Sequence, residues 1–270
     1  MPNRRRIGIL LAGLSCFILG VRSEARSDTS VSAPSAVKAD EAATHELLEG
    51  TRGRRETWAA APALLIETTV MDYSKGDLST GFVATDERLS DDEVAQLTAD
   101  LTAALGVLTA ETVASFQTVA RETSPAGQIV KVLRPGQIVV GRFRGVQGKT
   151  GNIGYGGRMT RNGEITQGFV VLDAKFDRES SERALLRTHE LGHALGFNHV
   201  QSRPSIMNAR VGSTLTDFDR AAIRAAFGES AAAQPLVLGR RPLPLCSFSR
   251  RAGMEDGGGP VMPRLARIGR

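Results

Sequence analysis

Apolar residues recur with helical spacing in one long segment near the middle of the first half of the chain. Ser90 is followed three residues later by Glu93, the pair that forms a capping box at the start of a helix. Behind this pair, apolar residues return every three or four positions, at Val94, Leu97, Leu101, Leu105 and Leu108. Residues with this spacing share one face of a helix. The pattern therefore predicts an amphipathic helix.

Other segments have the apolar runs and turn residues of β-strands. The run from Leu64 to Val70 predicts a strand, and we interpret the polar stretch after it, up to Arg88, as a loop. The strand-like runs FQTVA, QIVKVL and QIVVGRF follow, the last two separated by Pro135-Gly136. Next, YGGRMT and EITQGFVVLDAKF flank Asn162-Gly163, a signal for a two-residue hairpin turn. We expect several strands and a hairpin with an edge strand.

Two further helices are expected toward the C-terminus. The segment SSERALLRTHELGHALGF has apolar residues in helical spacing after a start at Ser180 or Ser181. The segment DFDRAAIRAAFG predicts a short helix that starts at Thr216 or Asp217 and stops at Gly228. Strands and helices together predict an α+β domain over residues 63–229.

The first residues of the chain have the pattern of a targeting segment. Arg4 to Arg6 precede an apolar run from Ile7 to Val21, about as long as the apolar region of a signal peptide. The small residues from Gly20 to Ser23 mark a cleavage point only weakly, so residues 1–27 are interpreted as a signal peptide or a signal anchor. The expected location is secreted or extracytoplasmic, in the periplasm or at the cell surface. Stable membrane insertion is expected only if the leader is uncleaved.

Two other segments lack the patterns of a folded core. Residues 28–62 are rich in Ser, Ala, Thr and charge with little apolar periodicity, which predicts a linker or a short pro-segment. Residues 230–270 are basic and rich in Pro, Gly and Arg, which predicts a disordered tail.

Net charge and cysteine content narrow the classes of function. The chain has a formal charge of +5, to which residues 1–27 and 229–270 contribute +4 each, so residues 28–228 carry −3. The basic residues therefore lie in a leader and a tail, and no nucleic-acid partner is expected. With the leader removed, Cys246 is the one remaining cysteine, which excludes an internal disulfide.

The string HELGHALGFNH carries the candidate chemistry. His189 and His193 lie four residues apart, so on a helix they point about 40° apart around the axis and can reach one ion. Gly196 permits a positive φ that ends the helix and returns the chain toward the ion at His199. Three imidazoles leave zinc one open position for water, the pattern of a catalytic site. Glu190 is placed to act as general base.

Two simpler interpretations of this string compete with catalysis. The motif can arise by chance on an ordinary helix, although three His, one Glu and one Gly at fixed offsets make chance improbable in a chain with 4 His. Alternatively, the histidines hold zinc only for stability. A structural zinc site normally has four protein ligands, and the one cysteine after the leader lies in the tail.

The string resembles the signature of metzincin zinc peptidases, H-E-x-x-H-x-x-G-x-x-H, and residues 189–199 match every fixed position. By this resemblance, Met207 in SIMNA would form the methionine turn beneath the metal. The closing helix, which finishes in Phe227-Gly228, resembles that of the matrixins. The resemblance covers about residues 64–228. It implies a metzincin-like zincin domain: a twisted, mostly parallel sheet with an antiparallel edge strand, an active-site helix and a C-terminal helix.

The sequence departs from the matrixin pattern at several positions. Val200 follows the third histidine where matrixins usually have Ser, and no Cys lies between residues 17 and 245 to serve as a cysteine switch. Asn208 and Ala209 follow Met207, so no tyrosine ligand of the astacin or serralysin kind is expected. No His lies between His45 and His189, which excludes a second, histidine-built zinc site. Ca²⁺ at Gly-rich or acidic loops stays open but unsupported.

The resemblance also implies a substrate and an activity. A protein or peptide substrate would lie antiparallel to an edge strand that we place at Tyr155, Gly156, Gly157, Arg158 and Met159. The implied protein is a monomeric zinc endopeptidase in which Glu190 and a zinc-activated water hydrolyse peptide bonds. The alternative from another class is a non-catalytic metzincin-fold binding module that retains zinc for stability. The intact Glu190 favours the enzyme.

Overall fold

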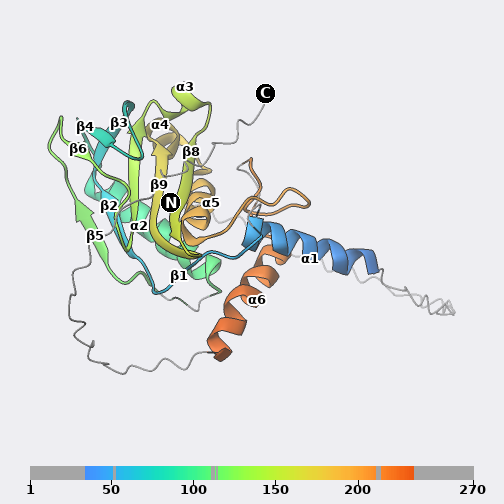
Figure 1. The fold of residues 1–270 in the computed structure, drawn as a ribbon. Helices are drawn as coiled ribbons and strands as arrows, with labels where there is room; N and C mark the ends of the chain where they lie inside the picture. The colour runs from blue at the N-terminus through green and yellow to red at the C-terminus, as the bar shows by residue number, and fades with distance from the viewer. Residues whose placement is uncertain (1–33, 51–52, 111–112, 114, 211–213, 234–270) are drawn as a thin grey trace, which may run out of the picture.

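The computed structural model describes residues 34–50, 53–110, 113, 115–210 and 214–233 (Figure 1). Its helices are α1 (Pro34–Glu49), α2 (Asp91–Leu108), α3 (Val146–Thr150), α4 (Ala174–Glu179), α5 (Arg183–Leu195) and α6 (Asp217–Ala233). Its strands are β1 (Thr57–Trp58), β2 (Ala63–Glu67), β3 (Thr69–Asp77), β4 (Gly81–Arg88), β5 (Val119–Glu122), β6 (Ile129–Val130), β7 (Gln137–Arg144), β8 (Gly154–Arg161) and β9 (Glu164–Asp173).

The strands form one mixed sheet with β7 at its centre. β7 pairs in parallel with β9 on one side and with β2 and then β3 on the other. The pairs β1 with β9 and β2 with β5 are also parallel. Antiparallel pairs lie toward the edges: β4 with β3, β6 with β4, and β8 with β9. The fold is therefore α+β with a curled, mostly parallel sheet and an antiparallel edge strand, as expected, and it is compatible with a zincin-like fold.

Side chains of the central strands alternate between two cores. Leu64, Ile138 and Val170 belong to the core between the sheet and the helices α2 and α5. Their neighbours in sequence Leu65 and Val139 point to the opposite face, where they join a second core. This alternation is what a pleated strand imposes. Because both faces are covered, these strands have continuous apolar runs, which made them easy to recognise in the sequence.

The predicted capping box and hairpin are both present. The Ser90 side chain accepts a hydrogen bond from the Glu93 backbone N–H, and the Glu93 carboxylate accepts one from the Ser90 N–H at 2.8 Å. All five predicted apolar positions of α2 are buried. At the β8–β9 turn, Asn162 and Gly163 have φ values of 55° and 86°, the left-handed conformation that this hairpin turn needs.

Several predicted boundaries are wrong. The stretch up to Arg88 that we interpreted as a loop forms most of the β3–β4 hairpin, whose outer half is polar and partly exposed. The apolar run from Leu64 to Val70 is divided at Thr68 into β2 and β3, which pair with successive parts of β7. The end of the predicted strand EITQGFVVLDAKF belongs to α4, because the Asp173 carboxylate caps that helix. Helix α5 begins at Arg183, later than the predicted serines.

The segments flanking the predicted domain also differ from expectation. Residues 34–49, predicted as linker or pro-segment, contain α1, in which Ala43 and Leu47 are buried four residues apart. A single i, i+4 pair was too short a pattern to predict a helix. Helix α6 continues past Gly228 to Ala233, because one glycine weakens a helix without ending it. The predicted leader, residues 1–27, and residues 234–270 of the predicted tail lie outside the described residues. Within the described part, every helix is too short or too polar to cross a bilayer.

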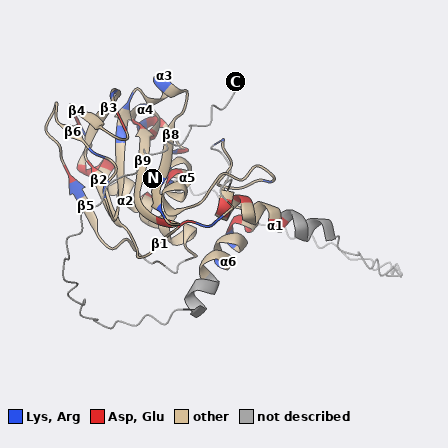
Figure 2. Ribbon diagram, viewed as in Figure 1, with Lys and Arg blue, Asp and Glu red and all other residues tan. Residues whose placement is uncertain are grey.

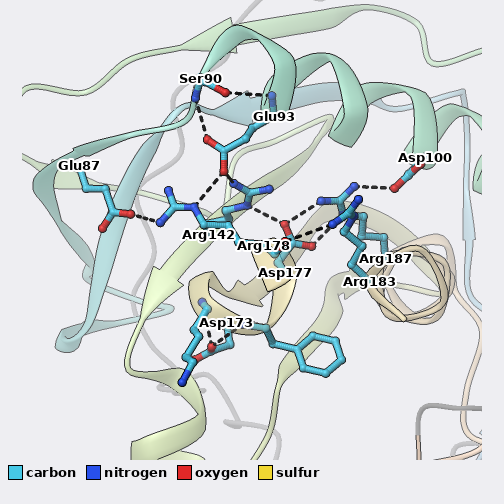
Figure 3. A network of polar contacts seen from close by, with 12 residues as sticks. Glu87, Ser90, Glu93, Asp100, Arg142, Asp173, Asp177, Arg178, Arg183 and Arg187 are labelled. Carbon is cyan, nitrogen blue, oxygen red and sulfur yellow. Dashed lines mark hydrogen bonds and ion pairs between the residues drawn. The ribbon is translucent and has the colours of Figure 1, made fainter. Parts of the chain in front are cut away.

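A buried network of charges joins α2, β7, α4 and α5 (Figure 3). Asp177 is fully buried and accepts hydrogen bonds from Arg142 Nε at 2.6 Å and from Arg187 Nε and Nη2 at 2.8 Å each. Arg142 also pairs with Glu93 on α2, and Arg187 pairs with Asp100. Since Arg187 lies on α5, this network fixes that helix against the sheet.

We predict that Asp177→Ala lowers the free energy of unfolding by about 3–5 kcal/mol, because it leaves two buried guanidinium groups without their shared carboxylate. Chemical denaturation measures this change. Asp86→Ala, which removes an exposed carboxylate from β4, is the control and should leave the free energy of unfolding almost unchanged. Similar values for both variants would contradict the structural role of Asp177.

Glu93 makes the stability depend on acid pH. Burial alone would raise its pKa, but the Ser90 N–H and the guanidinium groups of Arg178 and Arg142 outweigh burial and lower the pKa to about 2. The unfolded chain, with a pKa near 4.5, then binds more protons than the folded chain between these values. We predict that the stability advantage of wild type over Glu93→Gln is complete above pH 4.5 and falls as pH approaches 2, as measured by urea unfolding across pH. An advantage that is independent of pH would contradict this prediction.

Candidate metal centre

Helix α5 and the turn after it bring the three predicted histidines together. His189 and His193 lie one turn apart on α5. Gly196 follows the helix with φ of 119°, and its N–H donates to the Gly192 carbonyl at 3.1 Å, which ends the helix. A Cβ atom at Gly196 would lie 2.5 Å from the Glu56 carbonyl oxygen, so glycine is required for space as well as for φ. The chain then returns with His199 beside the other two histidines, as predicted.

The imidazole Nε2 atoms converge on one point. His193 Nε2 lies 3.2 Å from His189 Nε2 and 3.1 Å from His199 Nε2. The ligand nitrogens of all three lie within 4.8 Å of one another. Two nitrogens bound at 2.0–2.1 Å to one tetrahedral zinc ion are separated by about 3.3 Å. The two separations from His193 therefore match those of nitrogen ligands to a shared ion, and the third pair lies within 4.8 Å.

Backbone carbonyls set the tautomers of two of these rings. His189 Nδ1 lies 2.8 Å from the Ile206 carbonyl oxygen, and His193 Nδ1 lies 3.0 Å from that of Phe197. A carbonyl oxygen only accepts, so each Nδ1 donates and each neutral ring keeps a lone pair on Nε2. Facing lone pairs repel one another unless a cation lies between them. These carbonyls are the supporting contacts that orient histidine ligands in metal sites.

The protein environment also keeps the rings neutral. Burial lowers the pKa of His189 to about 4, partly opposed by the hydrogen bond to Ile206. Burial lowers the pKa of His193 well below 6.5 and lowers that of His199 in the same direction. Metal ions bind the neutral form of imidazole. Three neutral, convergent nitrogen donors suit zinc, and the centre can hold such an ion.

Glu190 is buried between α5 and the edge strand β8. It is 4% exposed, and its carboxylate accepts a hydrogen bond from the Gly156 N–H. Burial raises the pKa of Glu190 to about 8, although the Gly156 hydrogen bond opposes the shift. A Cβ atom at Gly156 would lie 2.0 Å from the Glu190 carbonyl oxygen, so β8 lies in direct backbone contact with α5. Only glycine fits at this position.

Met207 lies beneath the histidine-bearing helix, where the resemblance placed it. It is 1% exposed, and a Cβ atom at Gly192 would lie 2.6 Å from its sulfur. The buried Asp219 of α6 holds the turn around Met207, since its carboxylate accepts hydrogen bonds from the Ile206 N–H at 3.0 Å and from the Ser205 hydroxyl. Sequence analysis did not single out Asp219, although it lies in the acidic start of α6, a recognisable signal.

The five residues predicted for the substrate strand all lie on β8, which pairs only with β9 among the described strands. Their side chains differ in role. Tyr155 packs in an aromatic cluster, with its ring centroid 5.7 Å from that of Tyr73. Gly157 lies against Phe169, and Met159 is exposed. Arg158 instead points back to α5, where it donates to the His193 carbonyl at 3.0 Å. The position of these residues on an edge strand is confirmed, whereas substrate binding there stays a prediction, and a role for the Arg158 side chain inside the fold was missed.

No protein-family model matches the chain, and a search of curated proteins gives no significant match. The site therefore rests on its own geometry. Its spacing fits the H-E-x-x-H-x-x-G-x-x-H pattern of zincins, and three histidines are placed to hold a metal ion. In the described residues, no carboxylate cluster that could hold Ca²⁺ accompanies it.

We predict that the chain binds one zinc ion and that His193→Ala weakens this binding. Loss of a supporting hydrogen bond costs roughly 10–100-fold in metal affinity, and loss of a ligand should cost more. Competition with a chromogenic chelator measures the affinity. His45→Ala is the matched control, because His45 lies on α1 with an exposed side chain that pairs with Glu49. Equal zinc affinity in both variants would show that the cluster at 189–199 is not the metal site.

Proposed function

We propose that this protein is a zinc-dependent endopeptidase of the metzincin type, with a matrixin-like catalytic domain. One observation carries the proposal: the buried carboxylate of Glu190, the residue after the first of three clustered histidines, is hydrogen-bonded directly to an edge strand. A site that only stored zinc for stability would need neither a buried carboxylate nor an adjacent strand with an unpaired side.

The described residues supply the functions that amide hydrolysis requires. When bound, a zinc ion lowers the pKa of a coordinated water and polarises a substrate carbonyl. His189, His193 and His199 would hold the ion through Nε2. Glu190 takes a proton from the attacking water and passes it to the leaving nitrogen as the C–N bond breaks. No covalent intermediate with the chain is formed.

The proposed substrate binds along the edge strand β8. One side of β8 pairs with β9 over its whole length, and the other side is free of described strands. An extended peptide can pair with such an edge through its backbone. Gly156 brings this edge to Glu190, so a peptide bound there would have its carbonyl groups next to the general base. The Arg158 side chain is engaged with α5 and contributes only its backbone.

The subfamily is proposed on local features. Met207 beneath α5 and the final helix α6, whose Asp219 holds the methionine turn, fit a matrixin-like plan. Val200, where matrixins usually have Ser, is fully buried, and its N–H donates to the Met207 carbonyl at 3.0 Å. An apolar residue is therefore suited to this position, and we propose a divergent branch.

Location and partners are part of the same proposal. The leader of residues 1–27 supports export, so we propose an extracytoplasmic, monomeric enzyme acting on protein or peptide substrates. Basic and acidic residues are interspersed over the described elements (Figure 2). We therefore propose no nucleic-acid partner.

We predict that Glu190→Gln lowers zinc-dependent hydrolysis of unfolded casein by about 10²–10⁴-fold, the contribution typical of a general base, while zinc still binds. A fluorogenic peptide library and a casein assay measure the rate, and a chelator should abolish it in wild type. Glu182→Gln, exposed at the start of α5, is the control and should keep full activity. Zinc-loaded wild type that cleaves nothing in a broad library would overturn the enzyme and favour a zinc-stabilised binding module.

A further inference from the structure

The loop that carries His199 is held by a segment that lies about 150 residues earlier in the chain. The Asn198 N–H donates to the Leu47 carbonyl at 2.8 Å, and the Asn198 side-chain amide reaches the same oxygen at 3.3 Å. The Glu46 carboxylate accepts hydrogen bonds from the backbone N–H groups of Gln201 at 2.8 Å and Ser202 at 3.3 Å. These contacts lie on both sides of the third histidine.

Apolar packing supports these hydrogen bonds. Ala43 and Leu47 of α1 are 0% and 1% exposed, so this face of α1 belongs to the core. After the helix, Gly50 has φ of 55°, and a Cβ atom there would lie 2.7 Å from Asn198 Cγ. Asp40 forms an ion pair with Arg203 at the far end of the loop. We call residues 40–50 the N-terminal clamp.

Asn198 connects the N-terminal clamp to the edge strand. Its side-chain oxygen accepts a hydrogen bond from Arg158 Nη2 at 3.0 Å. Arg158 Nη1 donates to the Phe197 carbonyl at 3.2 Å, the same oxygen that accepts from His193 Nδ1. Arg158 is itself held by Glu56 at 2.8 Å. The residue that precedes His199 is therefore bonded to α1 on one side and to β8 on the other.

A loop ligand depends on such support more than a helix ligand does. His189 and His193 have positions set by α5, whereas His199 follows the end of the helix and lies on irregular backbone. If the loop populates other conformations, the apparent metal affinity falls in proportion to the fraction with His199 in place. Loss of supporting hydrogen bonds typically costs 10–100-fold in metal affinity.

We propose that the N-terminal clamp is a permanent part of the metal centre, in which Glu46, Leu47 and Asn198 act as positioning residues for His199. The functional chain then retains residues 40–50, and these residues are not a removable pro-segment. The inference rests on the metal centre on which the proposed function also depends, but it does not require proteolytic activity.

The test uses the full chain and zinc alone as the probe. Glu46→Ala and Asn198→Ala should each weaken zinc binding about 10–100-fold in chelator competition. Glu46→Gln keeps an acceptor oxygen for the Gln201 and Ser202 N–H groups and should recover most of the affinity. Asp86→Ala changes an exposed carboxylate of β4, outside the N-terminal clamp, and should bind zinc as wild type does.

Two further measurements separate positioning from general loss of structure. With Co²⁺ in place of zinc, the visible absorption of Glu46→Ala and Asn198→Ala should change as His199 leaves the coordination sphere. The unfolding midpoint of the metal-free variants shows whether each variant is folded. If Asn198→Ala does not fold, the zinc affinity of Glu46→Ala decides the test. Mass spectrometry of the zinc-loaded natural protein should find residues 40–50 present.

The outcomes distinguish this inference from the proposed function. Wild-type zinc affinity and an unchanged Co²⁺ spectrum in both alanine variants would overturn the clamp, as would a zinc-loaded natural chain that begins after residue 50. If the variants lose affinity while zinc-loaded wild type hydrolyses no peptide, the clamp stands and the endopeptidase does not. If wild type hydrolyses peptides and the variants keep full affinity, only the clamp fails.

Discussion

The close approach of three neutral imidazoles is the constraint on which the site depends. His193 Nε2 lies 3.2 Å from His189 Nε2 and 3.1 Å from His199 Nε2, and the lone pairs of His189 and His193 face each other. The protein maintains this arrangement because Ile206 and Phe197 fix the rings through Nδ1, and because burial favours the uncharged form. The rings are thus arranged to hold a metal ion, and metal binding would add stability to the folded state.

The surrounding fold holds these rings from several directions. Arg187 lies two residues before His189 and connects α5 to the buried Asp177, so the first ligand is joined to the charge network beneath the helix (Figure 3). Asp219 of α6 holds the turn whose Ile206 carbonyl orients the same ring. Contacts that look structural are in this way parts of the site, since each limits how far a ligand can move away from its neighbours.

The sequence predicted those features that depend on local spacing. His189 and His193 on one helix face, the turn at Gly196, the capping box at Ser90 and the hairpin at Asn162 each follow from residues close together in the chain. The predictions failed where distant partners decide. The outer half of β3–β4 lacks an apolar pattern, and α1 has only two buried positions among its described side chains, so neither shows its packing in sequence. Likewise, the sequence placed Arg158 only in the predicted substrate strand, and only the fold shows that its side chain reaches the end of α5.

The direct backbone contact at Gly156 also affects which residues of the edge strand β8 can vary. Because the spacing between β8 and α5 is set by main-chain atoms, it does not depend on side-chain size at neighbouring positions. Exposed residues such as Met159 can therefore vary without moving Glu190 relative to the strand. Under the proposed peptidase function, surface substitutions along this one edge would change the sequence preference and leave the placement of Glu190 unchanged.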